Sequence, residues 1–290
     1  LCRHSKHADK CNGLIGPAWV IEALSYHAKS AGDAEAREIA KRLFELHPFI
    51  SDVGLWERVD IDGRLWPVDP AFNHQLWLAA AAAQLEDESI RWKLERFIDG
   101  LKDSLTVHPD GCIAHVIKLP DHFAHIAVGN PKPLSDKIYR RLVPRFLRPV
   151  RQPQLVGASQ QDRDIGYHAF NLHAFAMLYP HLPDHSFWES SRFRAILDFA
   201  ESASHMDGCE NNPFAYPYNP VGVETAHALL CFRAQTKTEC ARKWWRRQVL
   251  HNLGAGQAPN NSWGANAHDT FTANARIYET VRLLPWDEDL

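Results

Sequence analysis

The stretch 69–77 (DPAFNHQLW) places a carboxylate, an amide and an imidazole directly before an alanine-rich run. These groups belong to Asp69, Asn73 and His74. A carboxyl group beside an imidazole is a pairing used in general acid/base catalysis, so Asp69 and His74 are candidate catalytic residues and Asn73 is a candidate substrate-binding residue. A structural interpretation stays open, in which Asp69 or Asn73 caps a helix and His74 is a hydrogen-bonded core histidine.

A second constellation lies in 161–178 (QDRDIGYHAFNLHAFAML), where Asp164, Tyr167, His168 and Asn171 follow at helical spacing. Residues at i, i+3, i+4 and i+7 share one face of an α-helix. A carboxylate one turn before an imidazole can orient it and raise its basicity, which makes Asp164 and His168 candidate catalytic residues. Tyr167 and Asn171 are candidates for binding hydroxyl groups. The alternative is a buried polar network that fixes helix packing.

A proline-rich loop before a further apolar helix carries Tyr216, Tyr218 and Asn219. Their aromatic rings and amide suit stacking and hydrogen bonding to a sugar, so all three are candidate substrate-binding residues. Packing within a surface turn is the alternative.

The last candidates lie in 260–281, where Trp263, His268, Asp269 and Arg276 are expected to bind substrate. An arginine at the mouth of a site would bind a carboxylate with its fork of donors, which favours acidic sugars. Arg276 could equally form an internal salt bridge to Asp269 or Glu279.

No metal and no cofactor are expected. Glu224 and His227 have the spacing of half a di-iron site, but no second copy is present. His122 and His125 lack a third ligand. The six cysteines form no CxxC pair and are expected to be free or buried thiols.

Composition narrows the class of partner. A formal charge of -3 provides no overall positive field for nucleic acid, and no run of about 18 apolar residues predicts a membrane span. A soluble, cytoplasmic protein is expected, although an upstream signal could have been removed because the chain starts without Met. The sequence does not indicate an oligomeric state.

Helices are predicted in pairs, one apolar and one charged, over 13–29 with 33–46, 73–84 with 88–105, 165–178 with 186–202, and 223–234 with 238–252. A helix over 269–284 stands alone. Two β-hairpins are predicted, over 55–68 and 105–119, because each contains an Asp-Gly step that suits a tight turn.

Paired helices of this kind predict an all-α fold, an α/α toroid in which each pair buries its apolar face against its neighbours. We expect a single domain over 1–290, since no Pro/Gly/Ser-rich linker divides the chain. The unpaired last helix would fit a closed ring whose first partner lies upstream of residue 1 or within 131–151. A parallel α/β sheet is the competitor, but neither GxGxxG nor a P-loop is present.

The segments 55–82, 163–180 and 269–281 together resemble the α/α-toroid carbohydrate-active proteins. They are similar in particular to the Agl-cluster Q-type proteins of glycan assembly, and more distantly to unsaturated-glucuronyl hydrolases and uronate epimerases or lyases. This resemblance implies a pocket that binds an oligo- or polysaccharide, with uronic acid as the expected sugar. It also implies an Asp as general acid/base, for which Asp69 and Asp164 are the positional candidates.

The first functional hypothesis is therefore a glycoside hydrolase in which Asp69 or Asp164 donates the proton and His74 or His168 assists. The second is a uronate lyase or C5-epimerase, in which His or Tyr removes the proton next to a carboxylate held by Asn or Arg. The third is a non-catalytic glycan-binding or assembly protein.

Overall fold

The computed structural model describes residues 11–119, 159–216, 219–233, 238–253 and 276–289. Within these ranges the chain is mostly helical, which confirms the all-α prediction at that level. The described residues fall into two compact units. Unit 1 takes its residues from 1–106 and 116–156, and unit 2 takes its residues from 107–115 and 157–290. The single domain and the closed ring stay predictions.

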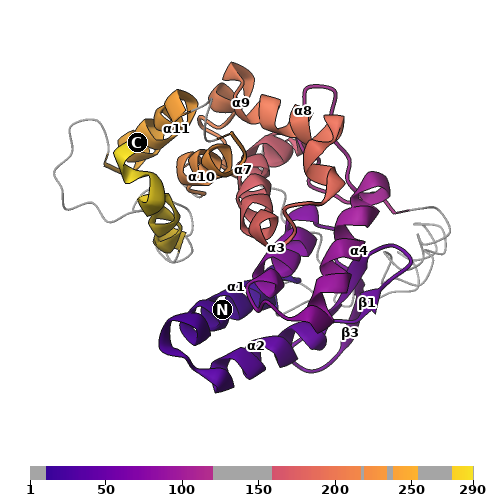
Figure 1. Ribbon diagram of the computed structural model, residues 1–290. Helices are drawn as coiled ribbons and strands as arrows, with labels where there is room; N and C mark the ends of the chain where they lie inside the picture. Colours follow the sequence, from indigo (N-terminus) through magenta and orange to yellow (C-terminus); the bar gives the residue numbers. More distant parts are fainter. Residues whose placement is uncertain (1–10, 120–158, 217–218, 234–237, 254–275, 290) are drawn as a thin grey trace, which may run out of the picture. The chain divides into compact units, whose positions relative to one another are not determined.

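Unit 1 contains four helices that the sequence predicts to within about two residues at each end. They are α1 (Ile15–Ala31), α2 (Ala34–Glu45), α3 (Phe72–Ala83) and α4 (Glu88–Ser104). α1 packs against both α2 and α3 (Figure 1). The predicted cap at Asp33 is confirmed, because its carboxylate accepts a hydrogen bond of 3.0 Å from the Ala36 amide.

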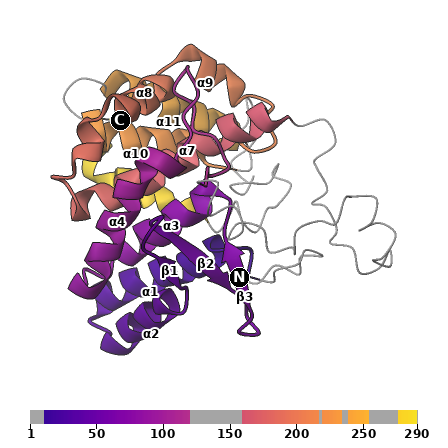
Figure 2. The ribbon, with the colours of Figure 1, turned by 90° about the vertical axis from the view of Figure 1, so that its right-hand side faces the viewer.

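Unit 1 also contains a three-stranded antiparallel sheet (Figure 2). Its strands are β1 (Phe49–Ile50), β2 (Leu55–Val59) and β3 (Leu65–Val68). The hairpin predicted over 55–68 is confirmed as β2 and β3, with Gly63 at φ 79° in its turn. The pairing shifts between Glu57 and Arg58, so that Pro67 is the extra residue of a bulge. Proline has no N–H for the ladder, and a bulge tolerates it.

The core of unit 1 is built around Trp56, which is fully buried. Its ring lies within 5.8 Å of the rings of Phe44, Phe49 and Phe97, measured between centroids. The Gln75 side chain hydrogen-bonds both the N–H and the carbonyl of Trp56, at 2.9 and 2.8 Å. These two hydrogen bonds tie the first turn of α3 to strand β2, next to the loop that carries Asp69.

Unit 2 contains α7 (Gln160–Leu178), η3 (Tyr179–His181), η4 (Ser186–Glu189), α8 (Ser191–Ala200), α9 (Ala203–Gly208), α10 (Val221–Arg233), α11 (Thr238–Leu253) and η5 (Arg276–Asp289). α10 packs against α7, α11 and η5 (Figure 1). The fully buried Trp244 of α11 donates to the Ala200 carbonyl at 3.0 Å, which ties α11 to the end of α8.

Three of the predicted elements of unit 2 need correction. The helix over 186–202 is interrupted, because the Ser190 side chain accepts from the Phe193 amide and starts α8 afresh. The helix over 269–284 is wrong in type for its described part, where 276–289 is a 3-10 helix. The sequence has a proline at position 285, and a residue without an N–H donor does not favour an α-helix there.

The hairpin predicted over 105–119 is wrong as a pair of strands. Its Gly111 does turn at φ 97°, but only Val107 and Ile113 form an isolated bridge. Val116 instead bridges Ala71 in unit 1. The turn places Gly111 so close to the backbone of Ala195 that a side chain would collide with it. Within the described ranges, no helix has the length and apolar character needed to cross a membrane.

Candidate functional site

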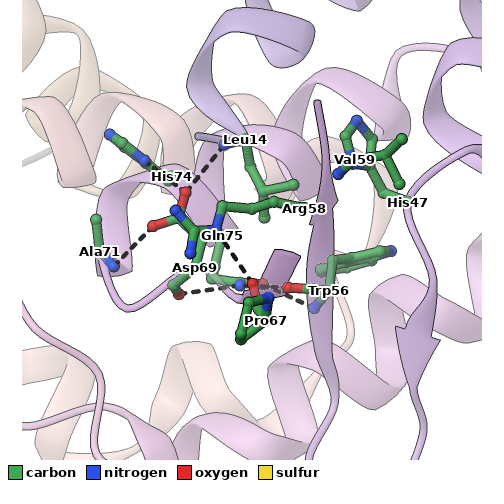
Figure 3. Close-up of polar contacts among 10 residues, drawn as sticks. All are labelled: Leu14, His47, Trp56, Arg58, Val59, Pro67, Asp69, Ala71, His74 and Gln75. Atoms are coloured by element: carbon green, nitrogen blue, oxygen red, sulfur yellow. Dashed lines mark hydrogen bonds and ion pairs between the residues drawn. The ribbon is translucent and has the colours of Figure 1, made fainter. Parts of the chain in front are cut away.

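Asp69 lies in the short link between β3 and α3 and is only 3% exposed. Its Oδ1 accepts a hydrogen bond from the Ala71 amide at 3.1 Å. Its Oδ2 accepts from the Leu14 amide at 3.0 Å and lies 2.8 Å from His74 Nδ1 (Figure 3). Both oxygens are thus engaged, and the carboxylate is fixed in position.

The Leu14 amide belongs to the start of α1, where no side chain of the helix itself caps the backbone. A carboxylate at a helix N-terminus is stabilised by the helix dipole, so Asp69 acts there as a cap supplied from 55 residues away. Asn12 and Gly13 take φ values of 61° and 64° and bend the chain toward Asp69. A side chain at Gly13 would collide with the Asp69 carboxylate and the His74 ring.

This geometry contradicts the alternative interpretation in which Asp69 or Asn73 caps helix α3. The N-cap of α3 is Ala71, and no side chain bonds to its first turn in the manner of a cap. Asn73 is 2% exposed, and its Oδ1 has no partner within the described chain.

The charge state of Asp69 follows from its neighbours. Burial by itself would raise its pKa, but the charge and hydrogen bond of His74, the charge of Arg58 and the Leu14 amide together lower the pKa to about 2. Asp69 is therefore ionised at neutral pH. This ionised state does not favour Asp69 as a proton donor, and its catalytic role stays a prediction.

His74 lies in the first turn of α3, and its side chain is 20% exposed. In the tautomer whose Nδ1–H donates to Asp69, Nε2 is the ring atom left to exchange a proton. Nε2 has no hydrogen-bond partner in the described part of the chain. A buried carboxylate that fixes the tautomer of a partly exposed imidazole is an arrangement suited to proton transfer.

Arg58 completes the surroundings of this pair. Its side chain extends from β2 toward the Asp69 carboxylate (Figure 3), and its Nε donates to the Pro67 carbonyl at 3.1 Å. Nearby, the buried His47 accepts from the Val59 amide at 3.2 Å, which ties the loop after α2 to the end of β2. The bulge at Pro67 thus orients a guanidinium beside the Asp69–His74 pair.

Asp164, in the first turns of α7, is also buried, but its partners differ from those expected. Its Oδ2 lies 2.9 Å from Nε2 of His108, and its Oδ1 accepts from the His115 amide and the Gln160 side chain, each at 2.8 Å. The expected pairing of Asp164 with His168 is wrong. Asp164 instead binds the turn 107–115 to α7.

His168 is fully buried and uses both ring nitrogens on the backbone. Its Nδ1 accepts from the Ile113 amide and its Nε2 donates to the Ile196 carbonyl, each at 3.2 Å. Burial and the neighbouring His205 lower the pKa of His168 well below its usual value. These contacts agree with the alternative interpretation of this helix face, a buried polar network that fixes helix packing.

The remaining candidates on α7 and in the loop before α10 are all described except Tyr218. Tyr167 is partly exposed and stacks on His115, with the ring centroids 4.9 Å apart. Asn171 is fully buried. The buried Tyr216 stacks on His251 at 3.9 Å between centroids.

Asn219 and Arg276 are both buried, and an Arg276 amino group donates a hydrogen bond to the Asn219 side chain. Arg276 also bonds Glu279, which confirms the internal salt bridge as the interpretation of this residue. The expectation of an arginine exposed at a mouth is wrong for the described chain. Tyr218, Trp263, His268 and Asp269 lie outside the described residues, as do His122 and His125.

Sequence reasoning did not select Arg58 or His108. Arg58 lies in a strand with alternating apolar and polar residues, where an arginine on the surface is ordinary. His108 lies directly before a Pro-Asp-Gly sequence, which indicates a turn and gives no signal for a function of the histidine. In the described part of the chain, no three His, Cys, Asp or Glu side chains gather as a metal site would require. Five described cysteines form no disulfide, namely Cys11, Cys112, Cys209, Cys231 and Cys240.

Comparison with known proteins gives one informative similarity. The chain is 31% identical over 285 residues to archaeal glycosylation protein Q of Haloferax volcanii, an alignment that covers 97% of this chain and 74% of that protein. No family model and no solved structure matches the chain. At this identity and coverage, the chain belongs to the archaeal glycosylation protein Q family.

Proposed function

We propose that this protein modifies a saccharide during glycan assembly and that His74, oriented by Asp69, is its acid/base residue. The contact of 2.8 Å between His74 Nδ1 and the buried Asp69 carboxylate carries this proposal, because it leaves Nε2 as the atom that can exchange a proton. The name of the Haloferax volcanii relative, a glycosylation protein, supports the saccharide as substrate. The predicted α/α toroid belongs to the same proposal.

The protonation states favour the second sequence hypothesis over glycoside hydrolysis. A general acid must hold a proton at working pH, and the pKa of Asp69 is about 2. A neutral imidazole with a free Nε2 is suited to remove a proton from carbon next to a carboxylate. We therefore propose abstraction of the C5 proton of a uronate residue.

In this reaction the C5–H bond breaks, the proton moves to His74 Nε2, and the electron pair is delocalised into the uronate carboxylate. Epimerisation ends when water delivers a proton to the opposite face of C5 and the proton on His74 Nε2 passes to solvent. Elimination ends when the pair forms the C4–C5 double bond, the C4–O bond breaks, and the departing oxygen takes the proton from His74 Nε2. Asp69 stabilises the imidazolium formed in the first step, because it stays ionised throughout.

Arg58 is the proposed carboxylate-binding residue of this site. Its guanidinium lies beside the Asp69–His74 pair and has the planar fork that matches a carboxylate. Positive charge next to the substrate carboxylate also lowers the energy of the negative charge that develops when C5 loses its proton.

The test is to incubate the purified chain with uronate-containing oligosaccharides in deuterium oxide. Three products are followed, namely deuterium at C5, absorbance of a 4,5-unsaturated sugar, and new reducing ends. We expect deuterium at C5 or the unsaturated product, and a loss of at least about 100-fold in either rate for His74→Ala. His27→Ala is the matched control, since His27 pairs with Asp33 at 3.2 Å on an exposed surface.

New reducing ends without the other two signals would show hydrolysis and overturn the proposed reaction. Saccharide binding without any of the three products would favour the non-catalytic binding or assembly role. Full activity of His74→Ala would remove His74 from the mechanism.

A further inference from the structure

A cavity of about 330 Å³ lies in unit 1, between the last turns of α1, the first turn of α2 and the turn that follows α3. Binding sites for small molecules begin at about 300 Å³, so this cavity has room for one small ring. An α-helix rises about 1.5 Å per residue, which places Gln84 of the cavity lining about 15 Å along α3 from His74. The cavity is therefore separate from the Asp69–His74 pair.

Part of the cavity lining is apolar and small. Ala28 on α1 and Ala34 on α2 have only methyl side chains, and Leu85 after α3 is 3% exposed. Ser25 is buried, and its hydroxyl donates to the Ile21 carbonyl of its own helix at 2.7 Å. These residues leave a surface that suits the C–H groups of a ligand ring.

Arg37 supplies hydrogen-bond donors to the cavity. Its Nη2 donates to the Leu85 carbonyl at 2.8 Å and lies 3.7 Å from Asp87 Oδ2, so one edge of the guanidinium is fixed. Its Nη1 lies 4.0 Å from Glu38 Oε1, which is beyond hydrogen-bond distance. Nη1 and Nε thus have no hydrogen-bond partner within the described chain. Because the guanidinium is planar, these donors are held in a fixed direction.

The other polar side chains of the lining supply acceptors and are also held in place. Lys29 Nζ and Glu86 Oε1 pair at 3.0 Å between α1 and the turn after α3. Asp33 Oδ1 accepts from the Ala36 amide at 3.0 Å, and Gln84 Nε2 donates to the backbone of α3 at 3.1 Å. Carboxylate and amide oxygens accept more than one hydrogen bond, so they can also accept from the hydroxyl groups of a ligand.

The charges around the cavity favour a neutral ligand. The charged residues of the lining, with the charged residues paired with them, are the cations Lys29, Arg37 and Lys41 and the carboxylates Asp33, Glu38, Glu86 and Asp87. His27, which pairs with Asp33 outside the lining, adds a positive charge only when it is protonated. Hydrogen bonds from Lys41 and Ser89 lower the pKa of Asp87 to about 2, so its negative charge persists at neutral pH. The cavity therefore has no excess of positive charge to attract an anion.

We propose that this cavity is a second saccharide site, which binds one neutral sugar unit and does not transform it. A sugar ring has C–H groups on its faces and, around its edge, hydroxyl groups that both donate and accept hydrogen bonds. The apolar lining matches the faces, and Arg37, Asp33 and Gln84 match the edge. No histidine is found among the described residues of the lining, so no imidazole there can act as His74 is proposed to act. The choice of a sugar among neutral polar ligands rests on the saccharide function proposed above.

The experiment is a titration of the purified chain with glucose, mannose, galactose and glucuronate, followed by calorimetry and ligand-observed NMR. We expect at least one of the three hexoses to bind. Ala34→Trp should weaken this binding at least about tenfold, because a large ring at this position occupies the cavity. Ala31→Trp is the matched control and should keep binding within about threefold, since Ala31 is exposed at the end of α1 and does not line the cavity.

Arg37→Lys tests the donors of the cavity separately from its charge. It keeps the positive charge but removes the planar fork, so it should weaken hexose binding at least about fivefold. Circular dichroism verifies that each variant is folded, and Arg37→Lys decides the question if Ala34→Trp does not fold. Glucuronate should bind wild type and Ala34→Trp equally, because the cavity does not attract its carboxylate.

His74→Ala separates this inference from the proposed reaction, since it should abolish turnover and leave hexose binding unchanged. Hexose binding that Ala34→Trp weakens, in a chain without any turnover, would support this site and overturn only the reaction. Turnover without binding of any hexose would overturn this site and leave the reaction standing. Hexose binding that neither Ala34→Trp nor Arg37→Lys weakens would also overturn it, because the sugar would then bind elsewhere.

Discussion

Replacing Asp69 by asparagine tests the electrostatic account of the site. The pKa of this carboxyl falls from 3.8 to about 2 on folding, which corresponds to about 2.4 kcal/mol of stability at neutral pH. The Asp69→Asn variant lacks that charge. Its side-chain amino group also faces one of the three donors from Leu14, Ala71 and His74, and that donor then has no acceptor. An unpaired buried donor costs about 1–3 kcal/mol by itself.

We therefore expect Asp69→Asn to lower the free energy of unfolding by about 3–5 kcal/mol at pH 7, and the melting temperature by about 5–8 °C. Urea titration and thermal melting, both followed by circular dichroism, measure these changes. Asp52→Asn is the matched control, because Asp52 is exposed and should change stability by less than about 0.5 kcal/mol.

The pH dependence gives a second test of the same variant. Because the folded pKa of Asp69 is depressed, its contribution is present above pH 3.8 and is lost as pH falls toward about 2. The difference between the wild type and Asp69→Asn should thus shrink over that window. A difference below about 0.5 kcal/mol at pH 7, or one that grows on acidification, would refute the reasoning.

Three further expectations concern backbone, acid stability and thiols. Gly13→Ala should abolish turnover, since its methyl group would collide with the Asp69 carboxylate and the His74 ring. Gly32→Ala, at a φ of 67° with open space around it, should keep turnover. Burial lowers the pKa of His47 and His205 to about 4. Lowering the pH from 7.5 to 5.5 should therefore reduce the free energy of unfolding, measured by urea titration, by about 1.4 kcal/mol for each histidine. His27→Ala should leave this pH dependence unchanged. Burial raises the pKa of Cys112 and Cys209, so both should react with a thiol reagent only after denaturation; rapid labelling of the native protein would contradict their placement.

Most helices of this protein follow from local sequence. Asp33 and Ser159 each lie directly before a helix and cap it with their own side chains, so those starts depend only on neighbouring residues. Alternation of apolar and charged helices is likewise a local pattern, because the period of 3.6 residues reveals which face is buried. A pairing between residues close in sequence, such as Asp69 with His74 five positions later, can be predicted by the same reasoning.

Contacts across long separations were decided by the tertiary structure alone. Asp69 binds the Leu14 amide 55 residues away, and Asp164 binds His108 56 residues away rather than His168 one turn along. Arg276 reaches Glu224 across 52 residues. Residue spacing predicts which groups share a helix face, but not which other element packs against that face, and burial then sets the charge of each group.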